Sequence, residues 1–208
     1  MRSEAEKLTF TQAARRAQIV TASIEVIAEF GWAQTSIRKI ADRVGVAMSA
    51  VLYHFGTKDN LVDAIVAEMY RSALLAVAPA LQAETTSAGK LTAYIRANIA
   101  YFDGHRMQLA ALAQLGVGYR PSDGRRLDEL GMTDELRKEL AVLDPTAILV
   151  AGQQDREFGE FPVESMSVAL RGAVNAVVER ILREPDFDAR AYAEDLVTIF
   201  NRAVALQR

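Results

Sequence analysis

Apolar residues recur with a period of about 3.6 along almost all of this 208-residue chain, and no segment alternates apolar and polar residues as a half-buried strand does. Ala, Leu, Glu, Arg and Gln, which favour helices, fill the long segments. The pattern predicts an all-α fold in which each helix buries one apolar face.

Capping and turn residues divide this pattern into helices. We expect Gly31 to end the first helix, Thr57 or Gly56 to cap the fourth, and Asp144-Pro145 to begin a later one. The polar segment 84–89 is interpreted as a break, and 120–133, rich in Gly, Pro and charge, as a loop with some irregular helix. The predicted helices span about 10–30, 36–43, 47–54, 58–81, 90–103, 106–118, 145–154, 163–184 and 188–205.

The sequence lacks the residues that several kinds of catalytic and metal site require. The chain has no Cys, and His54 and His105 are its only imidazoles, so thiolate chemistry is excluded and a conventional transition-metal site is disfavoured. No phosphate-cradling Gly loop or Ser-His-acid set stands in a recognisable context, and the acids Asp155, Glu157 and Glu160 are interpreted as a solvated helix end. We therefore expect neither an enzyme nor a cofactor or metal, although a helical enzyme or ligand carrier stays an alternative.

The chain opens with acids where a secretory signal needs an apolar core, and no stretch approaches the roughly 20 apolar residues of a membrane span. These features predict a soluble cytoplasmic protein with no membrane partner. Residues 1–60 hold eight basic and six acidic side chains, while 61–208 hold 16 basic and 21 acidic. A slightly basic N-terminal segment followed by an acidic remainder is typical of a protein that binds DNA through its N-terminal part, though charge differences of this size also arise by chance.

The stretch ADRVGVAMSAVLYHF, residues 41–55, places a tight bend between two short helices. Ala41 is small enough for a close helix crossing, and Gly45 accepts a positive φ at the turn. The apolar residues expected to bury the inner faces are Ile40, Val44, Val46 and Val51. This arrangement predicts a helix-turn-helix, whose second helix presents Met48, Ser49, Leu52 and Tyr53 to a major groove. The alternative is an ordinary helical hairpin within a core.

Residues 15–66 resemble the N-terminal domain of the TetR family of transcriptional regulators. The matching segments are Ile19 and Ala22, FGW at 30–32 with Thr35–Ser36, IADRVGV at 40–46 and YHFGTKDNL at 53–61. The resemblance covers about a third of the chain; the remainder fits only in being helical, with AGQQDREFGEF at 151–161 before a long penultimate helix. It implies a helix-turn-helix DNA-binding domain over 1–57 and a larger helical domain over 58–208 for effector binding and dimerisation.

The family's DNA contacts carry over to matching positions of this chain. Thr35, Ser36 and Lys58 fall at phosphate-binding positions, while Tyr53 and His54 fall where phosphate or bases are touched. Ala47 and Leu52 depart from the family's common Ser and Tyr. The full predicted DNA-binding set is Thr35, Ser36, Arg38, Ala47, Met48, Ser49, Ala50, Leu52, Tyr53, His54 and Lys58. In the alternative interpretation, Tyr53 packs against the protein, His54 forms a hydrogen bond with the backbone, and Lys58 is a solvated charge. We expect Trp32 and Phe55 to lie in the core rather than at the DNA interface.

The second helix of the motif contains no Arg, Lys, Asn or Gln, the usual bidentate base readers. We expect Met48 and Ala50 to contact thymine methyls, with further contacts from Ser49, Tyr53 and Arg38. These contacts predict only modest specificity for a particular DNA sequence.

The last two helices each carry an apolar stripe, which predicts a homodimer that reads two half-sites through a four-helix interface. The predicted interface residues are Met166, Leu170, Ala173, Val177, Ile181, Tyr192, Leu196 and Phe200. Alternatively, both stripes face only the chain's own core.

Helices between 60 and 160 are expected to enclose an effector pocket for an apolar small molecule with a few polar handles. The candidate lining residues, each equally compatible with ordinary core packing, are Tyr70, Tyr94, Tyr101, Phe102, His105, Met107, Gln114, Tyr119 and Phe158. The sequence thus predicts a TetR-like, ligand-released repressor that binds a palindromic operator in double-stranded DNA. The alternative is a helical ligand-binding or protein-interaction module whose helix-turn-helix no longer binds DNA.

Overall fold

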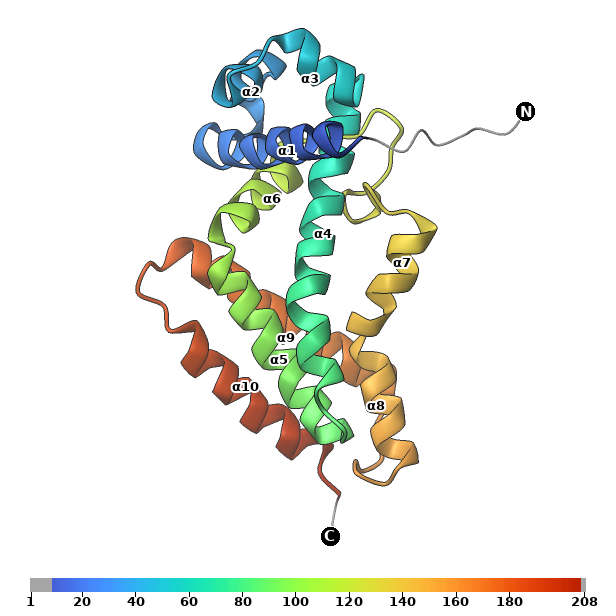
Figure 1. Ribbon diagram of the computed structural model, residues 1–208. Coiled ribbons are helices and arrows are strands. Elements are labelled where there is room, and N and C mark those ends of the chain that lie inside the picture. Colours follow the sequence, from blue (N-terminus) through green and yellow to red (C-terminus); the bar gives the residue numbers. More distant parts are fainter. Residues whose placement is uncertain (1–8, 207–208) are drawn as a thin grey trace, which may run out of the picture. The chain divides into compact units, whose positions relative to one another are not determined.

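The computed structural model describes residues 9–206, and all regular structure in that range is helical, which confirms the predicted fold class (Figure 1). The α-helices are α1 Phe10–Phe30, α2 Ile37–Val44, α3 Met48–Phe55, α4 Lys58–Gln82, α5 Ser87–Gly104, α6 Arg106–Gly118, α7 Asp134–Leu140, α8 Pro145–Gln154, α9 Val163–Arg183 and α10 Ala189–Val204. Short 3-10 turns are η1 Trp32–Gln34, η2 Leu127–Glu129 and η3 Ala141–Leu143. None of the described helices is both long and apolar enough to cross a membrane.

The predicted caps are present. Gly31 ends α1 with a φ of 78° and donates its N–H to the Ile27 carbonyl. The Thr57 hydroxyl accepts the Asn60 N–H at 3.1 Å in the first turn of α4, and the Asp144 carboxylate caps α8. These end signals act through local hydrogen bonds, so the sequence alone located them.

One helix boundary and one whole helix differ from the prediction. α5 begins at Ser87 because the Thr86 side chain accepts the Gly89 N–H, which shortens the predicted break. The seven-residue helix α7 was not predicted, since Leu136 is its one buried residue and leaves no apolar period to detect. Its cap was visible in the sequence: Thr133 accepts the Leu136 N–H at 3.1 Å.

The described chain divides into two compact units. One comprises residues 9–68 together with Ala110–Met132, and the other comprises Met69–Leu109 and the chain from Thr133 onward. The predicted functional domains, 1–57 and 58–208, stay a prediction. Contacts within the first unit show that residues 110–132 pack with the N-terminal helices.

In the first unit, each of the first four helices buries apolar side chains. These include Ile19, Val20, Ile24 and Ile27 of α1, Ile40 and Ala41 of α2, Val51 and Phe55 of α3, and Leu61, Val62 and Ile65 of α4. Ala41 is 1% exposed, as expected at a close helix crossing, and Gly45 is left-handed with a φ of 74°. Val44 and Val46 are half-buried. Burial of α2 and α3 by their inner faces fixes which residues of α3 face outward.

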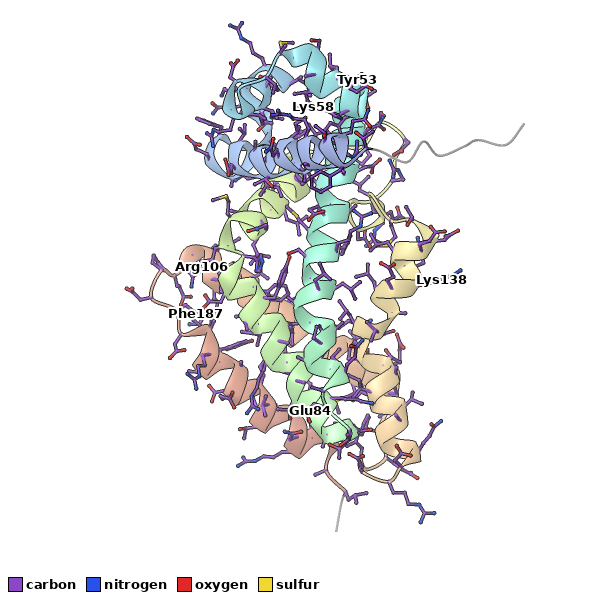
Figure 2. The ribbon with its side chains drawn as sticks, viewed as in Figure 1. Tyr53, Lys58, Glu84, Arg106, Lys138 and Phe187 are labelled. Carbon is purple, nitrogen blue, oxygen red and sulfur yellow. The ribbon has the colours of Figure 1, made fainter. Side chains whose placement is uncertain are left out.

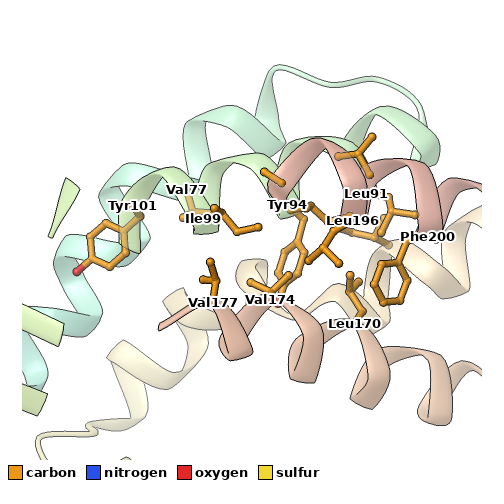
Figure 3. Close-up of a cluster of buried hydrophobic side chains, with 14 of the residues drawn as sticks. Val77, Leu91, Tyr94, Ile99, Tyr101, Leu170, Val174, Val177, Leu196 and Phe200 are labelled. Atoms are coloured by element: carbon orange, nitrogen blue, oxygen red, sulfur yellow. The ribbon is translucent and has the colours of Figure 1, made fainter. Parts of the chain in front are cut away.

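In the second unit, α5 packs against α8, α9 and α10. Figure 3 shows where buried side chains of α5, α9 and α10 meet. This core contains residues that the sequence assigned to a dimer interface: Leu170, Val177, Ile181, Leu196 and Phe200 are each at most 7% exposed. Met166, Ala173 and Tyr192 pack against the same core. Five of the eight predicted interface residues are thus buried within the chain's own core and the other three are half-buried, while the dimer interface itself stays a prediction.

Candidate nucleic-acid interface

The outer face of α3 exposes large side chains in a row. Met48 is 46% exposed, Leu52 41% and Tyr53 74%, and Ser49 is exposed beside them. Val51 and Phe55, on the opposite face, are buried. Such a concentration of exposed apolar groups on one short helix marks a contact surface. Ala47 is the N-cap residue of α3 and makes no side-chain capping hydrogen bond, and Ala50 is half-buried.

The start of α2 contributes surface polar groups. Ser36 is exposed and caps α2, with its hydroxyl accepting the Lys39 N–H at 3.2 Å. Arg38 has a side chain that is 80% exposed and lies 3.9 Å from the Asp42 carboxylate. Thr35 is turned inward: it is 4% exposed, and its hydroxyl donates to the Gly31 carbonyl at 2.8 Å. Ser36 and Arg38 are thus exposed at the surface, whereas the Thr35 side chain is buried and bonded within the protein.

Lys58, in the first turn of α4, is half-buried rather than fully solvated (Figure 2). Its ammonium group donates to the Thr35 carbonyl at 2.6 Å and lies 3.8 Å from the ring centroid of Trp32. Burial lowers its pKa below the usual lysine value, opposed by the nearby Asp59 charge. Trp32 is itself half-buried and packs edge-on against Tyr119 at 5.0 Å. Lys58 therefore ties the start of α4 to the start of α2.

The end of α3 contacts α1 through residues that sequence reasoning did not single out. Arg16 donates to the His54 carbonyl at 2.5 Å, and its guanidinium lies 4.1 Å from the Phe55 ring centroid. Gln12 donates to the Tyr53 hydroxyl at 3.4 Å. His54 is half-buried; burial, followed by the charges of Arg16 and Arg15, lowers its pKa. The available signal was that residues 10–24 carry two arginines and no acid.

The predicted effector residues are distributed over both units. Tyr94, Tyr101 and Phe158 lie in the core of the second unit, where Tyr70, Phe102 and His105 are half-buried and Met107 is 52% exposed. The Tyr101 hydroxyl donates to the Met69 carbonyl at 3.2 Å, and the His105 ring stacks on Tyr101 at 4.1 Å. Gln114 and Tyr119 belong to the first unit.

A hollow of about 330 Å³ in the second unit lies among Leu81, Lys90, Val142, Ile148 and neighbouring residues, and none of the nine predicted residues lines it. The effector pocket assignment stays a prediction.

Comparison with known proteins identifies the helix-turn-helix segment. Residues 19–65 match the family model described as bacterial regulatory proteins, tetR family. The fatty acid metabolism regulator protein of Bacillus subtilis is 28% identical over 144 residues, which cover 69% of this chain and 70% of that protein. An HTH-type transcriptional repressor of Mycobacterium tuberculosis is 51% identical over 49 residues, which cover 24% of this chain and 26% of that protein.

Solved structures agree on the fold. The regulator FadR from Bacillus subtilis, solved in complex with stearoyl-CoA, superposes with a TM-score of 0.75 at 20% identity, covering 90% of this chain and 98% of that one. A tetR-family regulatory protein from Rhodococcus RHA1 gives a TM-score of 0.71 at 23% identity over 93% of this chain and 98% of its own. The chain is therefore similar to TetR family transcriptional regulators in its helix-turn-helix segment, and its described residues share their fold.

Proposed function

We propose that the chain is a ligand-released repressor that binds a palindromic operator as a homodimer, with α3 in the major groove. The observation that carries this proposal is the exposed face of α3, formed by Met48, Ser49, Leu52 and Tyr53. Apolar groups on this face suit thymine methyls, and the Ser49 hydroxyl suits either a donor or an acceptor on a base edge.

Phosphate binding supports the same proposal. Ser36 and Arg38 are exposed at the start of α2, and Lys58 adds a cation at the adjoining start of α4. Because phosphate contacts supply most of the sequence-independent affinity for DNA, these groups compensate for a reading helix with no Lys or Arg. We leave Thr35 out of the proposed contact set because its side chain is engaged within the protein.

Selection of bound duplexes from a random pool, at two salt concentrations, tests the DNA-binding proposal. A consensus with two-fold symmetry, bound less tightly at the higher salt concentration, is expected. A featureless pool, or retention that does not depend on salt, would support the alternative of a module that keeps the motif without the DNA function. A reporter gene placed behind the recovered consensus then tests repression.

The dimer contact is proposed on the outer faces of α9 and α10 instead of their buried stripes. Val168 and Ile199 are each 56% exposed, and Ala169, Gly172 and Ala176 form a small, exposed row along α9. A Cβ added at Gly172 would meet nothing within 4 Å, so that face is open within the described chain. Small side chains on one face let two helices approach closely, as a four-helix interface between subunits requires.

Acyl-CoA thioesters are the effector class that we propose to test first. The match to the Bacillus subtilis fatty acid metabolism regulator extends over 144 residues, well beyond the helix-turn-helix, and the FadR structure of that organism contains stearoyl-CoA. Stearoyl-CoA is expected to release the protein from its selected duplex, whereas coenzyme A alone is not. Unchanged DNA affinity with stearoyl-CoA would reject this effector class and leave the DNA-binding proposal intact.

A further inference from the structure

We propose that the beginning of α1 belongs to the DNA-binding surface, with Arg15 contacting a backbone phosphate and Arg16 positioning the end of α3. This inference rests on the proposed DNA-binding function. It adds a helix outside the helix-turn-helix to the interface and assigns roles to two residues that the motif does not include.

The charges along α1 are unevenly distributed. Residues 10–24 contain Arg15 and Arg16 and no acidic side chain. The acids Glu25 and Glu29 come later in α1, and both pair with Arg43, whose single positive charge offsets part of theirs. α3 itself has no Asp, Glu, Lys or Arg. Residues 10–24 of α1 and the whole of α3 therefore contain two arginines and no acidic side chain.

Contacts of Arg16 place a positive charge at the C-terminal end of α3. Arg16 donates to the His54 carbonyl at 2.5 Å and lies 4.1 Å from the Phe55 ring centroid. The last carbonyls of a helix lack donors within the helix, and a cation beside them is favoured by the helix dipole. Arg16 thereby holds the end of α3 and fixes the backbone that carries Tyr53.

Arg15 occupies a different environment from its neighbour. Its side chain is exposed, whereas Arg16 is half-buried. Its charge nevertheless reaches the end of α3, since Arg15 contributes to the lowered pKa of His54. Gln12, one turn earlier, donates to the Tyr53 hydroxyl at 3.4 Å, so the same face of α1 adjoins the most exposed residue of α3. When α3 enters a major groove, the bordering phosphates come within reach of an exposed arginine at this position.

The test measures binding of the full-length protein to a short mixed-sequence duplex across a salt series, for the wild type and Arg15→Gln. We expect Arg15→Gln to lower the slope of log affinity against log salt by about one per subunit, with the melting temperature unchanged. Arg137→Gln, which removes an exposed arginine of α7, is the matched control and should leave the slope unchanged.

Two outcomes distinguish this inference from the proposed function. If the wild type binds with a clear salt dependence and Arg15→Gln keeps the same slope, the role of Arg15 is rejected while DNA binding stands. If the wild type shows no salt-dependent duplex binding, both proposals fail.

Arg16 is tested by charge rescue. Arg16→Gln is expected to weaken duplex binding, and Arg16→Lys to recover most of the affinity, because lysine restores a cation beside the end of α3. The melting temperatures of both variants show whether the fold is affected. Equal losses of affinity in variants of equal melting temperature would contradict the positioning role.

Discussion

The ammonium group of Lys58 lies 3.8 Å from the ring centroid of Trp32, and this contact joins the first turn of α4 to the segment before α2. The same ammonium donates to the Thr35 carbonyl at 2.6 Å, immediately before the Ser36 cap. One side chain thus anchors the start of α2, where two proposed phosphate contacts lie, and adds a positive charge to it.

Lys58→Ala is expected to weaken binding about equally on all DNA sequences and to lower the salt slope by about one per subunit. Lys58 contacts no base in the proposed interface, so its loss removes phosphate attraction without changing sequence preference. Anisotropy titrations on consensus and scrambled duplexes measure both quantities. A loss confined to the consensus duplex would show that Lys58 takes part in base recognition.

Ser49→Asn should change the selected consensus at one position in each half-site, toward adenine. An asparagine side chain can bond bidentately to adenine, and a well-formed pair of this kind discriminates by about 1–3 kcal/mol. Ser49 is exposed, so stability should be unaffected. Repeating the duplex selection with this variant measures the change, and Thr198→Asn, at an exposed position of α10, serves as control. An unaltered consensus would exclude Ser49 from base recognition.

If the chain forms the proposed dimer, Gly172→Arg is predicted to separate it into folded monomers. A Cβ at this position meets nothing within 4 Å in the described chain, so we expect the new side chain to obstruct only a subunit bound to this face. Replacing glycine within a helix also favours the helical state by up to about 1 kcal/mol. Sedimentation analysis gives the subunit mass, and Gly104→Arg, at another open glycine, is the matched control. If the Gly172→Arg protein keeps the mass of the wild type, the outer face of α9 is not the interface.

Arg156→Gly should stabilise the protein by about 1 kcal/mol, since a side chain at positive φ is strained and glycine is not. Arg156 is the non-glycine residue with positive φ in the described chain, at 58°. Urea unfolding at equilibrium measures the free energy. Arg71→Gly, in the middle of α4, should have the opposite sign, with a loss of about 1 kcal/mol. Equal effects from the two variants would contradict the strain argument.

Local signals account for what the sequence predicted correctly. Ala41 and Gly45 each meet a steric requirement at one position. Thr57 and Asp144 cap helices by accepting backbone N–H groups from residues three and two positions further along the chain. These constraints act within one or two turns, so the helices and the motif could be located without a structure.

Contacts between distant residues account for what was missed. The apolar stripes of α9 and α10 showed that one face is covered, but periodicity does not tell whether the same chain or a partner covers it. Leu170 and Phe200 are covered by their own chain. The bond from Arg16 to the His54 carbonyl joins residues 38 positions apart and has no local pattern. Similarly, aromatic composition did not show that Tyr119 would pack on Trp32.

The central claim, that the exposed face of α3 contacts DNA, is tested most directly by measuring duplex affinity of Leu52→Glu. Leu52 is 41% exposed, so a carboxylate there leaves the core intact but opposes the phosphates across the interface. Leu75→Glu, at a residue 77% exposed on α4, is the control. We predict a loss of at least about 100-fold for Leu52→Glu at an unchanged melting temperature, and little change for Leu75→Glu. Wild-type affinity in the Leu52→Glu protein would contradict the account.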